Sequence, residues 1–433
     1  MNVIKYPPEA EWPLLQQRPA LDVTSLFDTV RTVLNDVRHA GDAALRRLGK
    51  HFDKVWVEQL RATPEEIREA EQLLPEDLKQ AIRTARTHIE TFHASQRFTA
   101  RKVETAPGVT CWQKAVAIEK VGLYIPGGTA PLFSTVLMLA VPARIAGCSE
   151  IVLCTPPGRE GKVHPAILFA AQTAGVDQIF KVGGIQAIAA MAYGTQTVPK
   201  VYKIFGPGNQ YVTAAKQWVS LSEVAIDMPA GPSEVEIIAD ETAQPAFIAS
   251  DFLSQAEHGA DSQSMLLTTS EHLAEETVCE VERQLKRLPR RSLAERSLAG
   301  SRIILLKNMD EIIAFTNQYA PEHLIIQTAD CKAQAERIRN AGSVFLGPYT
   351  PESAGDYASG TNHTLPTKGY AKMYSGVNLD SFIRKITFQE ITADGLRGLG
   401  PAVEIMAEHE QLDAHKNAVS VRLDALSQNE SNK

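Results

Sequence analysis

The spacing of apolar residues changes along the chain, and each spacing predicts a different kind of element. Between residues 22 and 50 apolar side chains recur every three to four positions, which predicts an amphipathic helix. Residues 64–96 repeat this pattern, and Thr63-Pro64-Glu65-Glu66 is a capping pattern with proline in the first turn. The first 21 residues contain four prolines and little periodicity, so we expect an arm that packs on another part of the molecule.

Two central regions contain short runs rich in valine and isoleucine, each followed by a turn and a helical stretch. The first region covers about residues 115–240 and the second about 233–347. This alternation is typical of βαβ units, so it predicts two parallel α/β sheets side by side, with a cleft between them. After about residue 376 the pattern again predicts helix. The expected strands are 121–125, 151–154, 178–182, 203–205, 234–239, 264–268, 302–306 and 343–346.

Three of the expected strands in the first region end at glycine-rich turns. These turns are Pro126-Gly127-Gly128, Gly183-Gly184 and Gly206-Pro207-Gly208. Backbone N–H groups in such turns can face a phosphate, although each turn taken alone is better explained as an ordinary tight turn. Three turns in neighbouring units favour a shared ligand edge. They do not identify a dinucleotide, because the chain has no GxGxxG motif.

Composition narrows the class of partner. The net charge of −7 and the aromatic content of 6% argue against a nucleic-acid-binding surface and favour a small-molecule substrate. The N-terminus lacks the basic segment and apolar run of a secretory signal, and no stretch approaches the length of a membrane helix. We therefore expect a cytoplasmic protein without a membrane partner.

Two short motifs carry side chains that are common in catalytic sites. Gln255 and His258 are three residues apart in a helical stretch, so one face could supply two metal ligands, although a surface histidine would look the same. Glu322 and His323 follow a proline at an expected junction of loop and strand. Glutamate and histidine are the usual general acid–base residues, but a hydrogen-bonded turn is an equal alternative.

Further candidates lie near the end of the chain. Residues 353–363 have no helix or strand period; Asp356 there could ligate a metal, and His363 could meet a polar substrate group. Glu410 and His415 are five residues apart and do not share a helix face well, so they are either solvated or reach one site from a bent segment. Gln255, His258, Asp356 and His415 form a set of N and O ligands without thiolate. This set suits a catalytic zinc, although cobalt or manganese could replace it.

Six segments together resemble motifs of the histidinol dehydrogenase family, and their order extends the resemblance over essentially the whole chain. The segments are YIPGGTAPL at 124–132, FGPGN at 205–209, DMPAGPSE at 227–234, SQAEHG at 254–259, APEH at 320–323 and HKNAV at 415–419. The resemblance implies an α/β fold with two Rossmann-like parallel-sheet domains, a small mixed domain and a C-terminal helical tail. The implied domains are 22–123 with 233–375 for metal and catalysis, 124–232 for NAD, 1–21 with 376–405 for the small arm domain, and 406–433 for the tail.

The resemblance also implies a role for each matching residue. It implies one zinc per subunit, with His415 supplied by the partner in an intertwined homodimer. Glu322 and His323 would be the acid–base pair. The implied zinc ligands are Gln255, His258, Asp356 and His415, the implied NAD contacts are Tyr124, Gln186 and Asn209, and the implied substrate contacts are Ser233, His363 and Glu410 together with His323 and the zinc ligands.

The implied reaction is the oxidation of L-histidinol to L-histidine through L-histidinal, with two NAD⁺ consumed, at the end of histidine biosynthesis. Two alternatives remain. A sister dehydrogenase on the same scaffold would oxidise another small polar alcohol and would lack the imidazole-side contacts. A non-catalytic metal-binding protein would bind zinc without NAD and would leave Glu322 and His323 unexplained.

Overall fold

The computed structural model describes residues 3–18, 23–127, 130–229 and 231–431, and the chain divides into two compact units. The first unit is Met1–Gln96 with Ile118–Phe382, and the second is Arg97–Ala117 with Ile383–Lys433. None of the helices formed by the described residues combines the length and apolar character that crossing a membrane requires. Gly128 of the first glycine turn lies outside the described residues.

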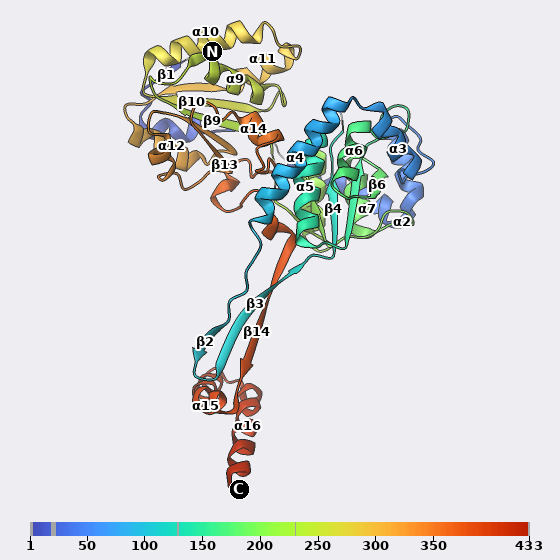
Figure 1. Cartoon of the computed structure of the whole chain (residues 1–433), viewed down its shortest axis with the longest axis vertical. Helices are drawn as coiled ribbons and strands as arrows, with labels where there is room; N and C mark the ends of the chain where they lie inside the picture. The colour runs from blue at the N-terminus through green and yellow to red at the C-terminus, as the bar shows by residue number, and fades with distance from the viewer. Residues whose placement is uncertain (1–2, 19–22, 128–129, 230, 432–433) are drawn as a thin grey trace. The chain divides into compact units, whose positions relative to one another are not determined.

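A parallel six-stranded sheet forms one half of the first unit (Figure 1). Its order is β1-β11-β10-β9-β12-β13, so the direction of strand addition reverses between β9 and β12. Side chains alternate between the faces: Val235 and Ile237 of β9 pack with α9, α10 and α11, whereas Ile238 packs with α12. The strands are Val3–Lys5, Arg302–Leu305, Gln263–Thr268, Glu234–Ala239, His323–Gln327 and Ser343–Leu346 in that order; the helices are α1 (Trp12–Leu15), α9 (Pro245–Ala256), α10 (Glu271–Leu285), α11 (Arg291–Gly300), α12 (Met309–Tyr319), α13 (Cys331–Ala335) and α14 (Glu352–Tyr357).

A parallel five-stranded sheet forms the other half, in the order β6-β5-β4-β7-β8. Its reversal point lies between β4 and β7. The sheet is covered by α3 to α6 on one face and by α2, α7 and α8 on the other. The strands are Gln178–Lys181, Glu150–Thr155, Lys120–Tyr124, Lys203–Phe205 and Ala225–Ile226 in that order; the helices are α2 (Phe27–Phe52), α3 (Pro64–Leu73), α4 (Glu76–Ala94), α5 (Phe133–Ala146), α6 (Pro165–Thr173), α7 (Gly184–Tyr193) and α8 (Gln210–Ser220).

The two-sheet fold class is confirmed, but the structure assigns several segments differently from the expected domains. Helices α2 to α4 lie within the expected metal domain, 22–123, yet they pack on the five-stranded sheet. Their apolar stripes predicted burial without saying against which sheet. The capping box of Thr63 and Glu66 is present, and Pro75 separates α3 from α4. Strand β1 of the arm pairs with β11, so the described part of the arm, 3–18, joins the six-stranded sheet and not 376–405.

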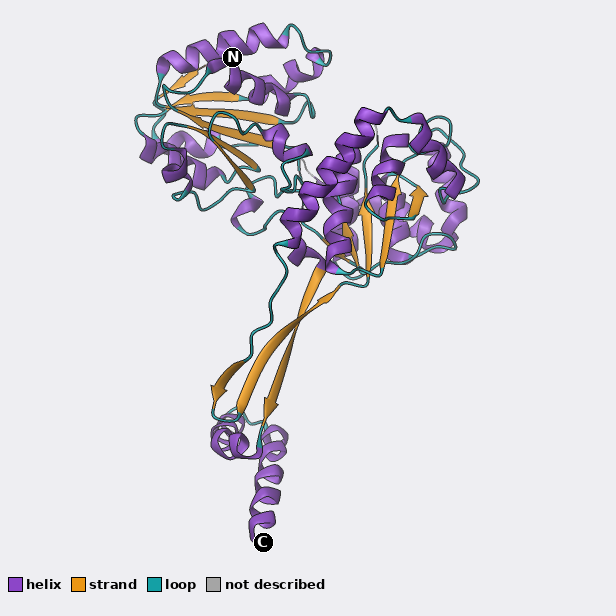
Figure 2. Cartoon of the chain, in the orientation of Figure 1, coloured by secondary structure: helices purple, strands orange, loops and turns teal. Residues whose placement is uncertain are grey.

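The second unit combines a three-stranded antiparallel sheet with two helices (Figure 2). Its strands are β2 (Val103–Ala106), β3 (Val109–Ala117) and β14 (Ile383–Ile391), and its helices are α15 (Ala393–His409) and α16 (Asp413–Ser431). The prediction of helix from residue 376 was therefore wrong for 383–391, where nine residues pair with β3. Helices α15 and α16 pack on each other, so the expected tail 406–433 is continuous with the small domain.

Candidate functional site

Glu322 and His323 lie at the amino end of β12, beside the amino end of β9, at the reversal point of the six-stranded sheet. Both side chains are buried. The backbone N–H of Glu234 donates to Glu322 Oε2 at 2.9 Å, and the carbonyl oxygen of Glu234 lies 3.2 Å from His323 Nδ1. A carbonyl can only accept, so Nδ1 carries the proton and Nε2 of the neutral ring is the basic atom. The sequence prediction of a junction of loop and strand is confirmed.

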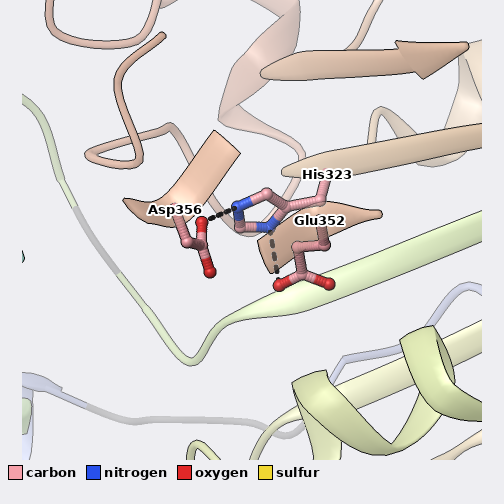
Figure 3. Close-up of side chains that lie close together, drawn as sticks. All are labelled: His323, Glu352 and Asp356. Atoms are coloured by element: carbon pink, nitrogen blue, oxygen red, sulfur yellow. Dashed lines mark ion pairs between the residues drawn. The ribbon is translucent and has the colours of Figure 1, made fainter. Parts of the chain in front are cut away.

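Three carboxylates surround the His323 ring. Glu322 Oε2 lies 3.6 Å from Nδ1. Glu352 Oε1 lies 3.8 Å from Nδ1, and Asp356 Oδ1 lies 3.5 Å from Nε2 (Figure 3). Burial lowers the pKa of His323, but the charges of Glu352, Glu322 and Asp356 outweigh it and hold the pKa well above its usual value. Burial raises the pKa of Glu322 to about 8. The site therefore holds fewer negative charges at neutral pH than its carboxyl groups would carry in water.

Glu352 is the member of this group that the sequence analysis missed. It is 1% exposed at the start of α14, and neither of its carboxylate oxygens is hydrogen-bonded to a described residue. Burial raises its pKa well above the usual value. The segment 353–363 lacked a visible period because α14 has only six residues. Pro351 before an acidic residue is a helix-start signal that could have located it.

The side chains that could hold a metal come from α9 and α14, which pack on each other. Gln255 is fully buried in the last turn of α9, and no described residue hydrogen-bonds to its Oε1 or Nε2. His258 follows the end of α9 with an exposed side chain. Burial of part of its ring lowers the pKa of His258, and the charge of Asp356 partly offsets this. His258 therefore lies close enough to α14 to feel the charge of Asp356. Asp356 Oδ1 is also buried without a hydrogen bond to a described residue.

The described His, Cys, Asp and Glu side chains form one group compact enough for a metal, namely His323, Glu352 and Asp356. Their potential ligand atoms all lie within 4.8 Å of one another. Asp356 is shared between this group and the ligand set expected from the sequence. Burial raises the pKa of Asp356, but the His323 ring, whose Nε2 lies 3.5 Å from Oδ1, lowers it further, so the carboxylate is ionised and available to a cation.

His363 and Ser233 are the expected substrate contacts in the first unit. His363 Nδ1 lies 2.9 Å from the carbonyl oxygen of Asp356, and its Nε2 lies 3.0 Å from Thr135 Oγ1 of α5. The carbonyl fixes the proton on Nδ1, so Nε2 accepts from the Thr135 hydroxyl. Ser233 is half-buried immediately before β9, next to Glu234. The structure thus brings His363 to Asp356, and Ser233 to the segment that contacts the acid–base pair.

At the five-stranded sheet, Tyr124 and Gln186 meet at the start of α7. The hydroxyl of Tyr124 accepts from the Gly184 N–H at 3.1 Å, and burial raises the pKa of Tyr124 to about 12. Gln186 Nε2 donates to Asp53 Oδ2 at 3.4 Å. Burial raises the pKa of Asp53 to about 6, and the hydrogen bond from Gln186 partly offsets this. Asp53, which ends α2, was not singled out from the sequence.

The turn after β7 lies against Tyr124 as well. Gly206 has φ +124°, and a Cβ there would lie 2.1 Å from the carbonyl oxygen of Tyr124, so the position requires glycine. Lys216 Nζ donates to the Gly206 carbonyl at 2.8 Å, and Asp227 Oδ2 accepts from the Gly206 N–H at 2.8 Å. The Asn209 side chain caps α8 by accepting from two backbone N–H groups. Tyr124, Gln186 and Asn209 therefore border turns at one edge of the sheet.

The described glycines of the other two turns approach a common neighbour, Pro156, which follows β5. A Cβ on Gly127 or Gly183 would lie 2.2 or 2.5 Å from a side-chain carbon of Pro156. The prediction that the turns share one edge is therefore confirmed.

Glu410 and His415 lie in the second unit, and both side chains are exposed. Glu410 ends α15, Gln411 adopts φ +59°, and α16 begins at Asp413. The break between the helices confirms that the two residues do not share a helix face.

Comparison with known proteins identifies the family. The family model for histidinol dehydrogenase matches residues 16–423. The histidinol dehydrogenase of Bacteroides thetaiotaomicron is 68% identical over 426 residues, which cover 98% of this chain and 100% of that one. That of Salmonella typhimurium is 53% identical over 422 residues, which cover 97% and 96%. The crystal structure of histidinol dehydrogenase from Elizabethkingia anophelis is 55% identical with a TM-score of 0.97 and covers 99% of each chain. The chain therefore belongs to the histidinol dehydrogenase family, the oxidoreductases that convert histidinol to histidine in histidine biosynthesis.

Proposed function

We propose that this protein oxidises L-histidinol to L-histidine in two stages, with two NAD⁺ consumed and one zinc bound per subunit. The observation that carries the proposal is the buried pair Glu322 and His323, held side by side by the backbone of Glu234. The two stages move two different protons, and this pair offers two groups that can accept them. In each stage the substrate transfers a hydride to NAD⁺.

The zinc ligands we propose are Gln255, His258 and Asp356, with His415 of the partner subunit. The fully buried amide of Gln255 and the buried Oδ1 of Asp356 fit a metal, because buried polar atoms without hydrogen bonds are rare unless another group satisfies them. The donor set has the oxygen and imidazole ligands that zinc accepts in catalytic sites. When bound, zinc supplies a positive template that fixes the imidazole and amino groups of the substrate.

In the first stage, His323 accepts the hydroxyl proton of the substrate. It does so from the neutral form of the ring, in which the Glu234 carbonyl holds the proton on Nδ1 and Nε2 is the atom that accepts. The alcohol carbon loses a hydride to NAD⁺ as the oxygen loses its proton, giving the aldehyde, NADH and H⁺. His363 and Ser233 would orient the polar groups of the substrate.

In the second stage, Glu322 activates a water molecule that adds to the aldehyde. A carboxyl with a pKa of about 8 is closer to neutrality than an ordinary glutamate, so its ionised form is a stronger base. The hydrate then loses a hydride to a second NAD⁺ and a proton to His323, giving the carboxylic acid. Tyr124, Gln186 and Asn209 would bind NAD⁺ at the glycine-rich edge.

The test is the number of NADH formed per L-histidinol when the substrate is limiting. We expect two, lost on chelation and restored by zinc. Glu322→Gln should slow the oxidation of histidinal far more than that of histidinol. Glu236→Gln is the matched control, because Glu236 is a fully buried carboxyl on β9 with a pKa also raised to about 8, hydrogen-bonded to Thr316 instead. One NADH per substrate, or equal losses in both stages for Glu322→Gln, would contradict the proposal.

The proposed sharing of His415 can be tested by mixing two inactive variants. Neither His258→Ala nor His415→Ala should have activity alone. A mixed dimer would contain one site with both mutations and one intact site, so random reassociation should restore about a quarter of wild-type activity. A mixture without activity, despite mixed dimers on native mass spectrometry, would mean that His415 serves its own chain or neither site.

A further inference from the structure

Arg18, in the N-terminal arm, forms an ion pair with a residue that contacts the proposed acid–base pair. Its Nε and Nη2 donate to the two carboxylate oxygens of Glu234, with Nη2 2.9 Å from Oε1. The Glu234 side chain is 2% exposed and the Arg18 side chain is 16% exposed. A paired, largely buried guanidinium and carboxylate have a fixed relative orientation, so the contact sets where the backbone of Glu234 lies.

The same guanidinium also binds the chain segment that leads into Glu322. Arg18 Nη2 donates to the carbonyl oxygens of Tyr319 at 2.8 Å and Ala320 at 3.4 Å. Its carbon Cζ stands 3.7 Å from the centre of the Tyr319 ring. Ala320 has φ +56°, a conformation that costs a non-glycine residue free energy and persists only where neighbouring contacts hold it.

Arg18 therefore joins the two backbone segments whose separation decides the geometry of the site. One segment carries Glu234, whose N–H and carbonyl meet Glu322 and His323. The other carries Glu322 and His323 themselves, two and three residues after Ala320. A shift of either segment would change the hydrogen bonds that orient the pair.

We infer that Arg18 is a positioning residue for the acid–base pair, acting through Glu234 and the Tyr319–Ala320 backbone. This inference rests on the proposed function of Glu322 and His323. It assigns the N-terminal arm a part in catalysis, although the arm contributes no group to the reacting atoms. Both stages should depend on it, because Glu234 contacts both members of the pair.

The experiment compares Arg18→Met and Arg18→Lys with Arg302→Met, each as the full-length zinc enzyme. Arg302 holds the same arm by donating to the carbonyl oxygens of Leu15 and Gln17, but no described contact joins it to Glu234. We expect Arg18→Met to lower kcat for histidinol and for histidinal by roughly ten- to a hundredfold, since small misplacements of catalytic groups have effects of that size. KM for NAD⁺ and zinc content should change less than about twofold. Arg18→Lys should recover part of kcat, and Arg302→Met should retain most of it.

The possible outcomes separate this inference from the proposed function. Wild-type kcat in Arg18→Met would overturn the inference, as would an equal loss in Arg302→Met, which would indicate docking of the arm in general. If Arg18→Met does not fold, Arg18→Met combined with Glu234→Gln removes the unpaired buried charge, and it should show the same loss of kcat. Glu322→Gln in the same assays tests the proposed function alone: if it slows both stages equally, the assignment of the pair fails whatever Arg18→Met does.

Discussion

The two parallel sheets use opposite ends of their strands. The six-stranded sheet presents Glu322, His323 and Glu234 at the amino ends of β12 and β9. The five-stranded sheet presents glycine turns at the carboxyl ends of β4, β6 and β7. Both edges include the reversal point of their sheet. Open α/β sheets usually bind ligands there at the carboxyl ends of the strands, whereas the six-stranded sheet carries the acid–base pair at the amino ends. Topology therefore selects the position along the sheet but not the end of the strands.

The chemical means differ as well. The first edge relies on buried ionisable side chains whose pKa values are shifted by burial and by one another. The second relies on close backbone approaches that only glycine permits, with Asp53 as an ionisable side chain of shifted pKa beside the proposed NAD contacts. Substitutions should therefore affect charge and metal at one edge, and shape and nucleotide at the other.

His258→Ala should give the largest effect and should be confined to the six-stranded edge. Removing the imidazole removes a proposed zinc ligand, so we expect loss of bound zinc on elemental analysis and a fall in activity of more than about a hundredfold. NAD⁺ binding should persist. His272→Ala, which alters an exposed histidine in the first turn of α10, is the control. Full zinc content in His258→Ala would contradict the assignment of His258 as a zinc ligand and, with it, the proposal that the six-stranded edge is the metal site.

Gly206→Ala should give the next largest effect, at the other edge. The added methyl would meet the Tyr124 carbonyl, at a φ that side-chain-bearing residues rarely adopt. We expect KM for NAD⁺ to rise roughly thirtyfold because the turn must move, with zinc content unchanged. The control is Gly300→Ala. Gly300 is the last residue of α11, no described atom lies within 4 Å of the methyl that alanine would add, and the variant should behave as wild type. An unchanged KM would show that this turn is structural.

Glu236→Gln should have a smaller effect, a pH-dependent change in the stability of the six-stranded sheet. The folded protein keeps a proton on Glu236 up to about pH 8, whereas the unfolded chain releases it near the ordinary value of 4.5. Wild-type stability therefore falls as pH rises through this interval, and glutamine removes that loss. We expect the variant to gain about 1–2 kcal/mol relative to wild type between pH 6 and pH 7.5, measured by urea unfolding. Parallel pH profiles would contradict the shifted pKa.

Asp53→Asn should give the smallest effect, at the charged group of the glycine-rich edge. Below pH 6 protonation of Asp53 weakens its acceptance of the Gln186 amide, so KM for NAD⁺ should rise two- to threefold between pH 7 and pH 5. The variant should have a flatter profile. Arg46 and Lys181 line the same cavity as Asp53. A profile of unchanged shape in the variant would show that another group titrates.

Much of the fold follows from periodicity, and the failures have identifiable causes. β7 and β9 have the expected bounds because apolar runs and glycine turns delimit them. Strand β14 was mistaken for helix because it lies at the surface, mostly exposed, and its pairing with β3 comes from distant sequence. The partner of α2 could not be inferred because an apolar stripe records burial but not what covers it.

The site was predictable where a motif is local and not where it depends on contacts. Glu322 and His323 are adjacent in sequence, so their pairing was visible. Glu352 reaches His323 from α14, and Arg18 reaches Glu234 across 216 positions of sequence. Such contacts form only when the sheet has its strand order, so the spacing of residues in the sequence cannot predict them.

Because the two sheets use opposite strand ends, their edges also favour ligands of opposite charge. Helices in these units run antiparallel to the strands, so the amino ends of strands meet the carboxyl ends of helices. α9 and α12 end beside Gln255 and Glu322, and the negative poles of their macrodipoles favour a cation there. At the other sheet α7 and α8 begin beside Tyr124 and Asn209, and their positive poles favour an anion such as a pyrophosphate. One architecture thus provides two sites of opposite electrostatic preference without a change of fold.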